Sequence, residues 1–366
     1  GSQEISPSAW QISQVTSTGT IFETQIPGEI SDLLLNFKTL ARARHPNYLG
    51  SNTNVSIAKT GTTGNRITIS DDDRIKVGNQ SLVGATLVLR SAPWLIEATS
   101  IISYDRATGI ASMSETTAQP LNTGAGYHLE GLQWMLDTDG EWFHDSSSQR
   151  LYLFLSQNNI PSTPVDIIRP RSTLTFRGIP KIRIQQLAVL NSGINGLQIL
   201  NCSDSTVTDV NIKRSKVNGI IIDSEPGYAL PQGISVEHSL VEEAGSTGIS
   251  SRLVKTKIHN NKIAFIGTHP SIVTPIAAIK VSERQSIVSW NTITQTGFNG
   301  ISARNRAELI IKNNDITYAC TRLTDCAGIY IWDNSPDQSR QFGTENRIAR
   351  SSVPNLTGAV GGSPDL

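Results

Sequence analysis

The residues best suited to chemistry gather near the C-terminal end of the chain, where Asp325 is followed closely by Tyr330, Trp332 and Asp333. A carboxyl group can donate or accept a proton while a bond breaks. Exposed aromatic rings beside cations are typical of surfaces that bind sugars. These residues therefore point to a carbohydrate-binding surface, provided that the fold brings cations to the same place.

A repeated pattern in the second half of the chain indicates such a fold. A small residue followed by Leu or Ile recurs at steps of 22 to 30 residues, as Gly196-Leu197, Gly219-Ile220, Gly248-Ile249, Ala278-Ile279, Gly300-Ile301 and Gly328-Ile329. An Asn followed two residues later by Ile recurs in a second, interleaved series, at Asn261, Asn291, Asn314 and Asn346. Helical repeats would show longer amphipathic runs, and leucine-rich repeats their own Leu frame. The two series predict a right-handed parallel β-helix with at least two strands in each coil.

The repeat also assigns inward positions. Ile249, Ile279, Ile301 and Ile329 are expected to stack in one inward column. The recurring Asn residues are expected to form an internal ladder that satisfies backbone groups of the turns. We interpret these Asn residues as structural rather than catalytic.

Alternation along each strand assigns the outward face, because successive side chains of a strand point to opposite sides. If Ile329 and Ile331 point inward, Tyr330 and Trp332 point outward. The same count predicts two outward columns, Ile221–Ser250–Lys280–Ser302–Tyr330 and Asp223–Arg252–Ser282–Arg304–Trp332. Cations and aromatic rings would then line one surface. The alternative is that Tyr330 and Trp332 pack under a loop formed by residues 334–366.

The first part of the chain shows strands but no repeat. Short apolar runs such as Thr86–Leu89, Ile101–Tyr104 and Leu151–Leu155 are separated by turn residues. Prolines between residues 161 and 170 mark a boundary. We therefore predict an all-β protein, with a small N-terminal β domain over residues 1–170 and a parallel β-helix domain over residues 171–366. The second domain also fits a β-helix that is incomplete at both ends.

Composition favours an extracellular protein. Lys plus Arg and Asp plus Glu both number 31, so the formal charge is zero and nothing favours nucleic acid as a partner. Only 17% of residues are charged, against about 25% in typical soluble domains. No apolar run approaches the roughly 20 residues of a membrane span, so no membrane contact is expected. We expect a secreted, cell-surface or periplasmic protein.

Cys320 and Cys326 are close enough to form a disulfide, and two free thiols are the alternative.

Several stretches resemble right-handed β-helix carbohydrate-active proteins, including family 141 of the glycoside hydrolases. In the second half they are Thr296–Ile301, Asn314–Ile316 and Leu323–Trp332; in the first half they are Ala41–Asn47, Asp137–Trp142 and Leu151–Leu153. The resemblance covers most of the chain, and Asp325 matches an Asp that often precedes the Ile-Tyr-aromatic strand of such proteins. It implies a secreted, bacterial-type glycosidase that acts on a polysaccharide.

Glycoside hydrolysis requires two carboxyl groups, about 5–5.5 Å apart for retention of configuration and about 6.5–9.5 Å apart for inversion. Asp325 is our first candidate, Asp333 the second and Glu283 a third. Tyr330, Trp332, Arg304, Lys280, Arg252 and Asp223 are the candidates for substrate binding. Alternatively, Asp325 is only a turn residue, since Asp is common in turns.

Two rival functions remain open. A polysaccharide lyase would use Lys280, Arg304 or Arg252 to remove a proton from a uronic acid and to neutralise its carboxylate. A non-catalytic carbohydrate-binding β-helix would use the same surface without cleavage. We expect no metal site and no cofactor, although calcium would be possible in a lyase. Besides the polysaccharide, the expected partners are further segments of a larger protein, or another chain, that cap the β-helix.

Overall fold

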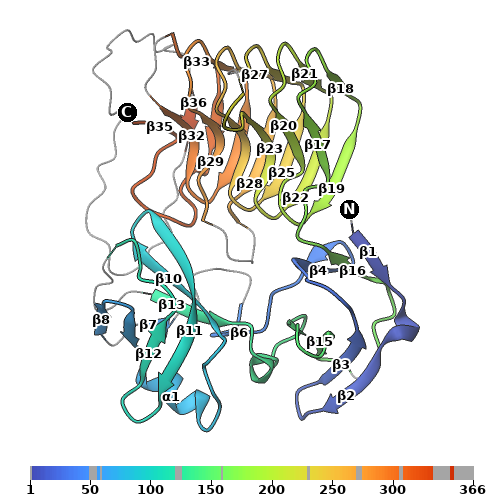
Figure 1. Cartoon of the computed structure of the whole chain (residues 1–366), viewed down its shortest axis with the longest axis vertical. Helices are drawn as coiled ribbons and strands as arrows, with labels where there is room; N and C mark the ends of the chain where they lie inside the picture. Colours follow the sequence, from blue (N-terminus) through green and yellow to red (C-terminus); the bar gives the residue numbers. More distant parts are fainter. Residues whose placement is uncertain are drawn as a thin grey trace. The chain divides into compact units, whose positions relative to one another are not determined.

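The computed structural model describes residues 2–48, 56–57, 60–119, 126–157, 160–228, 231–268, 274–304, 308–332 and 347–349 (Figure 1). Among these residues the only α-helix is α1 (Asp71–Val77), and two short 3-10 turns cover Pro7–Ala9 and Gln133–Met135. Almost all remaining regular structure is β, which confirms the predicted all-β class. The chain divides into two compact units, with the change between Ile168 and Arg169.

The N-terminal unit is built from antiparallel pairs of strands. One sheet has the order β1 (Ser2–Ile5), β16 (Val165–Ile168), β4 (Asp32–Leu35), β5 (Lys38–Thr39). A second has the order β14 (Trp142–Asp145), β15 (Arg150–Leu155), β3 (Thr20–Gln25), β2 (Gln11–Val15). The largest has the order β6 (Arg44–His45), β13 (Gly126–Glu130), β10 (Thr86–Ala92), β11 (Leu95–Asp105), β12 (Ile110–Met113), β9 (Arg66–Thr68), β8 (Thr60–Thr63), with β7 (Ser56–Ile57) beside β13.

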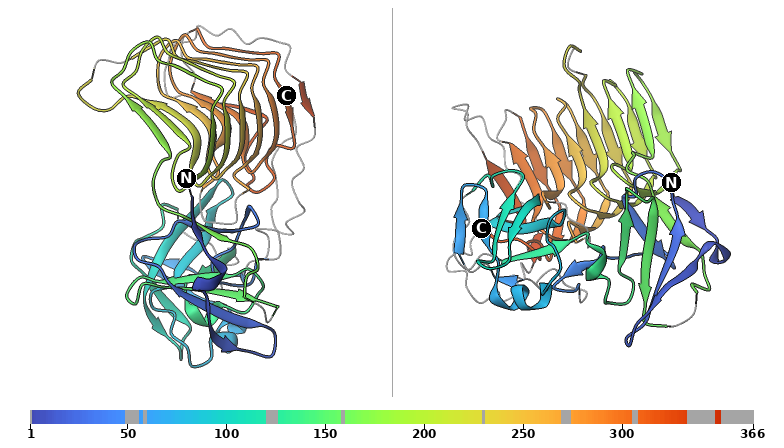
Figure 2. Two further views of the ribbon diagram at one scale, coloured as in Figure 1. Left: turned by 90° about the vertical axis from the view of Figure 1, so that its right-hand side faces the viewer. Right: turned by 60° about the horizontal axis from the view of Figure 1, so that its bottom comes forward.

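The second unit is a right-handed parallel β-helix made of three parallel sheets (Figures 1 and 2). The first parallel sheet contains β17 (Leu174–Arg177), β20 (Leu197–Leu200), β23 (Asn218–Asp223), β26 (Thr247–Ser251), β29 (Ala277–Val281), β32 (Asn299–Arg304) and β35 (Ile329–Trp332). The second contains β18 (Arg183–Gln185), β21 (Thr206–Thr208), β24 (Ser235–Glu237), β27 (Lys257–His259), β30 (Ile287–Ser289) and β33 (Ile310–Lys312). The third contains β19 (Ala188–Ser192), β22 (Asn211–Ser215), β25 (Leu240–Ala244), β28 (Lys262–Ile266), β31 (Thr292–Thr296), β34 (Asp315–Thr317) and β36 (Arg347–Ala349).

The predicted inward column is confirmed. Ile249 pairs with Ile279, Ile279 with Ile301, and Ile301 with Ile329 in successive coils of the first parallel sheet. Ile249, Ile279 and Ile301 are fully buried, in a core with the inward residues of the other two sheets. A parallel sheet brings like residues within about 4.8 Å of each other, so each added coil extends one continuous apolar core.

The small residue before each inward Ile is explained by close packing between coils. A Cβ atom added to Gly219 would lie 2.6 Å from the carbonyl oxygen of Gly248 and 2.4 Å from Cγ1 of Val241. The same atom on Gly248 would lie 2.5 Å from the carbonyl oxygen of Ala278. The backbone of the next coil therefore excludes a side chain at these two positions.

The predicted Asn ladder is also present, between the second and third parallel sheets. Nδ2 of Asn261 donates to Oδ1 of Asn291 at 3.0 Å, and Nδ2 of Asn291 donates to Oδ1 of Asn314 at 2.9 Å. The backbone N–H of Asn261 donates to the same Oδ1 of Asn291 at 3.0 Å. All three side chains are buried. Asn346, the last member of the predicted series, lies outside the described residues.

We predict that Asn291→Ala destabilises the β-helix strongly. The change removes an acceptor from Asn261 and a donor from the carbonyl of Ile258, which Nδ2 of Asn291 contacts at 3.1 Å. Each buried polar group left unpaired costs about 1–3 kcal/mol. Denaturant unfolding followed by circular dichroism measures the loss. Asn211→Ala, at an exposed position of β22, is the matched control, and an equal small loss in both variants would contradict the structural role of the ladder.

Candidate functional site

The outward face of the first parallel sheet carries the cationic residues expected from the sequence. The strand register aligns Ile221, Ser250, Lys280, Ser302 and Tyr330 in one column, as predicted. Arg304 pairs with Trp332 in the neighbouring column. We call the surface around Lys280, Arg252 and Arg304 the cationic face.

Arg252 and Asp223 are joined across adjacent coils of this face. Nη1 of Arg252 lies 3.3 Å from Oδ2 of Asp223, and the two side chains are 63% and 17% exposed. An exposed ion pair of this kind contributes only about 0–1 kcal/mol to stability. The more useful consequence is that Asp223 holds one end of the guanidinium in place while most of the side chain remains open to solvent.

Lys280 occupies the middle of the cationic face. Burial lowers the pKa of the Lys280 ammonium, and the nearby Arg252 guanidinium lowers it further. Its column neighbours Ser250 and Ser302 are 8% and 5% exposed. A lysine with a lowered pKa is more readily deprotonated, which suits it to act as a base.

Asp325 lies on a turn that is fixed at both sides. Cys326, the next residue, forms a disulfide with Cys320, so the alternative of two free thiols is wrong for this pair. The N–H of Ala327 donates to Oδ1 of the buried Asn299 at 2.9 Å. Asp325 itself is exposed and has a φ of 61°, in the left-handed region that Asp tolerates better than most residues. A short covalent loop therefore holds an exposed carboxyl group just before β35.

The structure does not bring all the predicted carboxylates together. Asp325 precedes β35 and lies at the edge where the strands of the first parallel sheet begin, whereas Glu283 follows the end of β29 at the opposite edge. A strand rises about 3.3 Å per residue, so the two edges are too far apart for Asp325 and Glu283 to act as one pair. Glu283 is half-buried, and its carbonyl accepts a hydrogen bond from Ser286.

Asp333 and the side chain of Trp332 lie outside the described residues, although the backbone of Trp332 ends β35. Tyr330, which precedes it on the outward column, is 40% exposed. The predicted roles of Asp333 and Trp332 therefore stay predictions.

A buried cluster of ionisable residues in the N-terminal unit was not predicted from the sequence. Arg44, Glu130 and Glu141 are 1%, 2% and 1% exposed. The Glu141 carboxyl group accepts backbone N–H groups from Arg44, Asp137 and Thr138 at 3.2 to 3.4 Å. Glu141, Asp137 and Thr138 belong to the stretch Asp137–Trp142, and Arg44 belongs to the stretch Ala41–Asn47. The two stretches thus meet in space and tie two distant parts of the unit together.

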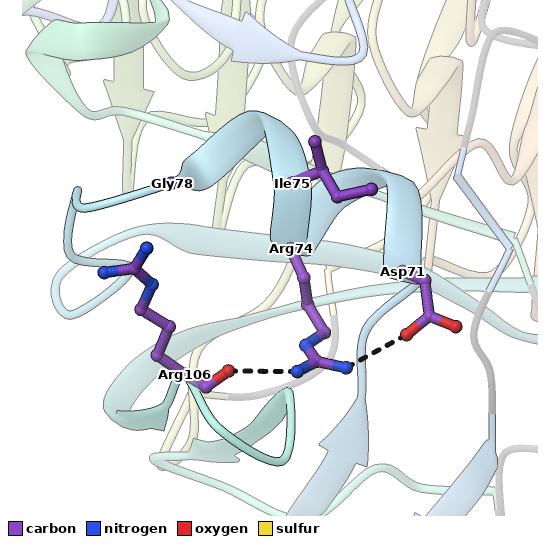
Figure 3. Close-up of a pocket in the computed structure, with 5 residues that line it drawn as sticks. All are labelled: Asp71, Arg74, Ile75, Gly78 and Arg106. Atoms are coloured by element: carbon purple, nitrogen blue, oxygen red, sulfur yellow. Dashed lines mark hydrogen bonds and ion pairs between the residues drawn. The ribbon is translucent and has the colours of Figure 1, made fainter.

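A surface pocket of about 400 Å³ beside α1 is a further candidate (Figure 3). Its lining residues are Asp71, Arg74, Ile75, Gly78 and Arg106. Nη1 of Arg74 donates to Asp71 at 3.0 Å, and Nη2 donates to the carbonyls of Ala107 at 2.7 Å and of Arg106 at 3.3 Å. Because the guanidinium already binds protein groups, we interpret the pocket as a packed turn rather than a ligand site.

The described part of the chain contains no group of three or more His, Cys, Asp or Glu residues that could hold a metal ion. No helix in it is long and apolar enough to span a membrane.

Comparisons with known proteins show the fold but not a family. No family model and no curated protein sequence matches the chain, so the resemblance to family 141 stays an expectation. A solved structure described as a glycoside hydrolase is similar over 94% of this chain and 82% of its own, with a TM-score of 0.57 and 11% identity. The A-module of the Azotobacter vinelandii mannuronan C-5 epimerase AlgE4 is similar over 49% of this chain and 58% of its own, with a TM-score of 0.28 and 11% identity.

The buried cluster generates a prediction about pH. Burial raises the pKa of Glu141 to about 8, against the opposing effect of the backbone N–H donors. The protonated form is therefore favoured in the folded protein, and this contribution is complete only below the unfolded pKa of about 4.3. As the pH rises towards 8 the contribution is lost, so the free energy of unfolding should fall between about pH 5 and pH 8.

Denaturant unfolding at several pH values tests this dependence. Glu141→Gln cannot ionise and should flatten the fall, although it should also be less stable because the Gln amide nitrogen cannot accept a backbone N–H. Glu115→Gln, at an exposed site, should keep the wild-type slope. Equal slopes in wild type and Glu141→Gln would show that Glu141 is already ionised in the folded protein.

Proposed function

We propose that this chain is a carbohydrate-active enzyme that binds a polysaccharide along the cationic face and cleaves its glycosidic bonds. The observation that carries the proposal is the stacking of Lys280, Arg252 and Arg304 on successive coils beside the exposed ring of Tyr330. Like charges on neighbouring coils repel each other, and they gain favourable interactions when an acidic ligand binds. A sugar ring can in addition stack on an aromatic side chain.

Hydrolysis is the first chemistry we propose. Asp325 would act as the acid or base, because it is exposed and held by the Cys320–Cys326 disulfide at the edge of the sheet that carries Tyr330. The glycoside hydrolase with a similar fold over 94% of this chain supports hydrolysis as the chemistry, although not the choice of Asp325. The second carboxyl group must be one other than Glu283, and Asp333 remains our candidate for it. The proposed enzyme is secreted and requires no metal ion for this step.

Elimination is the second candidate, and the lowered pKa of Lys280 favours it. In this reaction the Lys280 amine would remove the proton beside the carboxylate of a uronic acid, while Arg252 or Arg304 would neutralise that carboxylate. The bond to the leaving sugar oxygen would then break, and an unsaturated sugar would form. A calcium ion would be compatible with this alternative only.

We predict that Asp325→Asn lowers the rate of polysaccharide cleavage by about 10²–10⁴-fold, as expected when a proton-transfer group is removed. The melting temperature should hardly change, because Asn also tolerates the left-handed backbone at this turn. Asp209→Asn is a matched control, since Asp209 has a φ of 51° at another corner of the β-helix. Reducing-end assays on neutral and uronic acid polysaccharides give the rates. Full activity of Asp325→Asn would leave Asp325 as a turn residue.

The reaction products and the variant Lys280→Arg together distinguish hydrolysis from elimination. Arg keeps the positive charge but does not deprotonate, so a hydrolase should largely keep its activity and release no products that absorb as unsaturated uronides. A lyase should release such products, and Lys280→Arg should abolish them. Binding of a polysaccharide without any release of reducing ends would instead favour the non-catalytic module.

A further inference from the structure

Three aromatic side chains border a different surface of the β-helix, the outward face of the third parallel sheet. Phe265, Trp290 and Tyr318 are 40%, 55% and 38% exposed. They come from three successive coils, the ones that contribute β28, β31 and β34. We call these three residues the aromatic rim.

The strand register places the rim on both edges of the sheet. Phe265 and Tyr318 lie at the edge where the strands end, one on each side of the coil of Gln295. Two coils separate them, which corresponds to about 10 Å. Trp290 precedes β31, so it lies at the opposite edge of the middle coil. The three rings thus surround the short strand β31.

The left-handed corners accept large side chains, since Glu243 and Gln295 share the corner of Phe265 and Tyr318, but nothing in the coil requires an aromatic ring there. Phe265, Trp290 and Tyr318 have φ values of 58°, 59° and 54°, in a region that is costly for bulky side chains and that Gly and Asn enter more readily. Asn260 and Asn313 occupy the corners on either side of Trp290, with φ values of 52° and 56°. An Asn would therefore suit the corner of Trp290 better, and the exposed ring adds nothing to the buried core.

The floor between the rings is polar and has no net charge. Thr292, Thr294 and Thr317 point outward there, and Oγ1 of Thr317 donates to Oγ1 of Thr294 at 3.0 Å. Lys262 and Asp315 pair with Thr292 from the two sides and contribute one charge of each sign. A protein interface of ordinary kind has a continuous apolar centre, and a polyanion needs an excess of cations. Separate rings around hydroxyl groups therefore fit neither a protein partner nor a polyanion.

We infer that the aromatic rim is a second carbohydrate-binding surface, which takes a neutral segment of a polysaccharide. The rings would stack on the apolar faces of sugar units, and the Thr hydroxyls would exchange hydrogen bonds with sugar hydroxyls. The inference does not depend on the proposed catalytic function, because the surface belongs to another sheet and performs no chemistry. It differs from the cationic face in charge, and therefore in the polymers that it selects.

Affinity electrophoresis in native gels tests the inference directly. The gels contain galactomannan, arabinoxylan, mixed-linkage β-glucan or dextran as neutral probes, and polygalacturonate as an acidic one. The variant combines Phe265→Asn, Trp290→Asn and Tyr318→Asn, and it should fold well because Asn suits all three corners. Tyr228→Asn, which removes a ring that is 58% exposed elsewhere, is the matched control. Melting temperatures and light scattering establish folding and oligomeric state.

We expect at least one neutral polymer to retard the wild-type protein and the Tyr228→Asn control equally. Trp290→Asn alone should weaken binding by about tenfold, as for a central aromatic anchor, and the triple variant should migrate as in a gel without polymer. Retardation by polygalacturonate should be unchanged. The inference is overturned if no neutral polymer retards the wild type, or if the triple variant is retarded as strongly. It is also overturned if wild type forms dimers that the triple variant loses, since the rim would then join two copies of this chain.

Discussion

Register between successive coils is the constraint on which the rest of the structure depends. Side chains of a strand alternate between two faces, so a slip of one residue would turn the buried Ile column outward and place Lys280 in the core. The close approach of the backbones at Gly219 and Gly248 holds neighbouring coils together along the first parallel sheet. The Asn ladder fixes the corner before the third parallel sheet, because the side-chain amides of Asn261 and Asn291 each bond both the preceding coil and the following one. The close backbone approach and the Asn ladder together disfavour any other stacking of the coils.

Fixed register also explains how residues far apart in sequence can form one surface. Inward positions are committed to the apolar core, whereas outward positions lie outside that core and can accumulate residues of one kind. Lys280 and Arg252 are neighbours on adjacent coils, and their proximity helps to lower the pKa of Lys280. Such a cluster opposes folding slightly through charge repulsion, and the continuous apolar core compensates for it. A function is expected at a site where the scaffold tolerates such charge repulsion.

The sequence predicted the repeating features that carry several like residues in each coil, and it missed the shortest repeated strands and the contacts that do not repeat. The inward Ile column, the Asn ladder and the column through Lys280 follow from alternation and from like residues at a regular step, so they could be predicted without coordinates. The second parallel sheet was not resolved as a separate element, because its strands have three residues and each offers a single inward side chain, such as Val207 or Ile258. The cluster of Arg44 with Glu141 was missed for a different reason. Its members are 97 residues apart and no period relates them.

The residues at the corners of the β-helix show which positions of the repeat only satisfy the backbone and which point to a function. Each corner requires a left-handed backbone, and Asn260 and Asn313 meet this requirement with the residue type that it favours. Asp325 meets it as well, so its conformation alone does not distinguish a catalytic residue from a turn residue; its exposure and the adjacent disulfide are what single it out. Phe265, Trp290 and Tyr318 are not residue types that this backbone conformation favours, and a large part of each ring is exposed to solvent. Their presence is therefore better explained by a ligand outside the coil than by the coil itself. Since the first parallel sheet presents cations and the third presents rings around hydroxyl groups, one scaffold would contact acidic and neutral parts of a polysaccharide on separate faces.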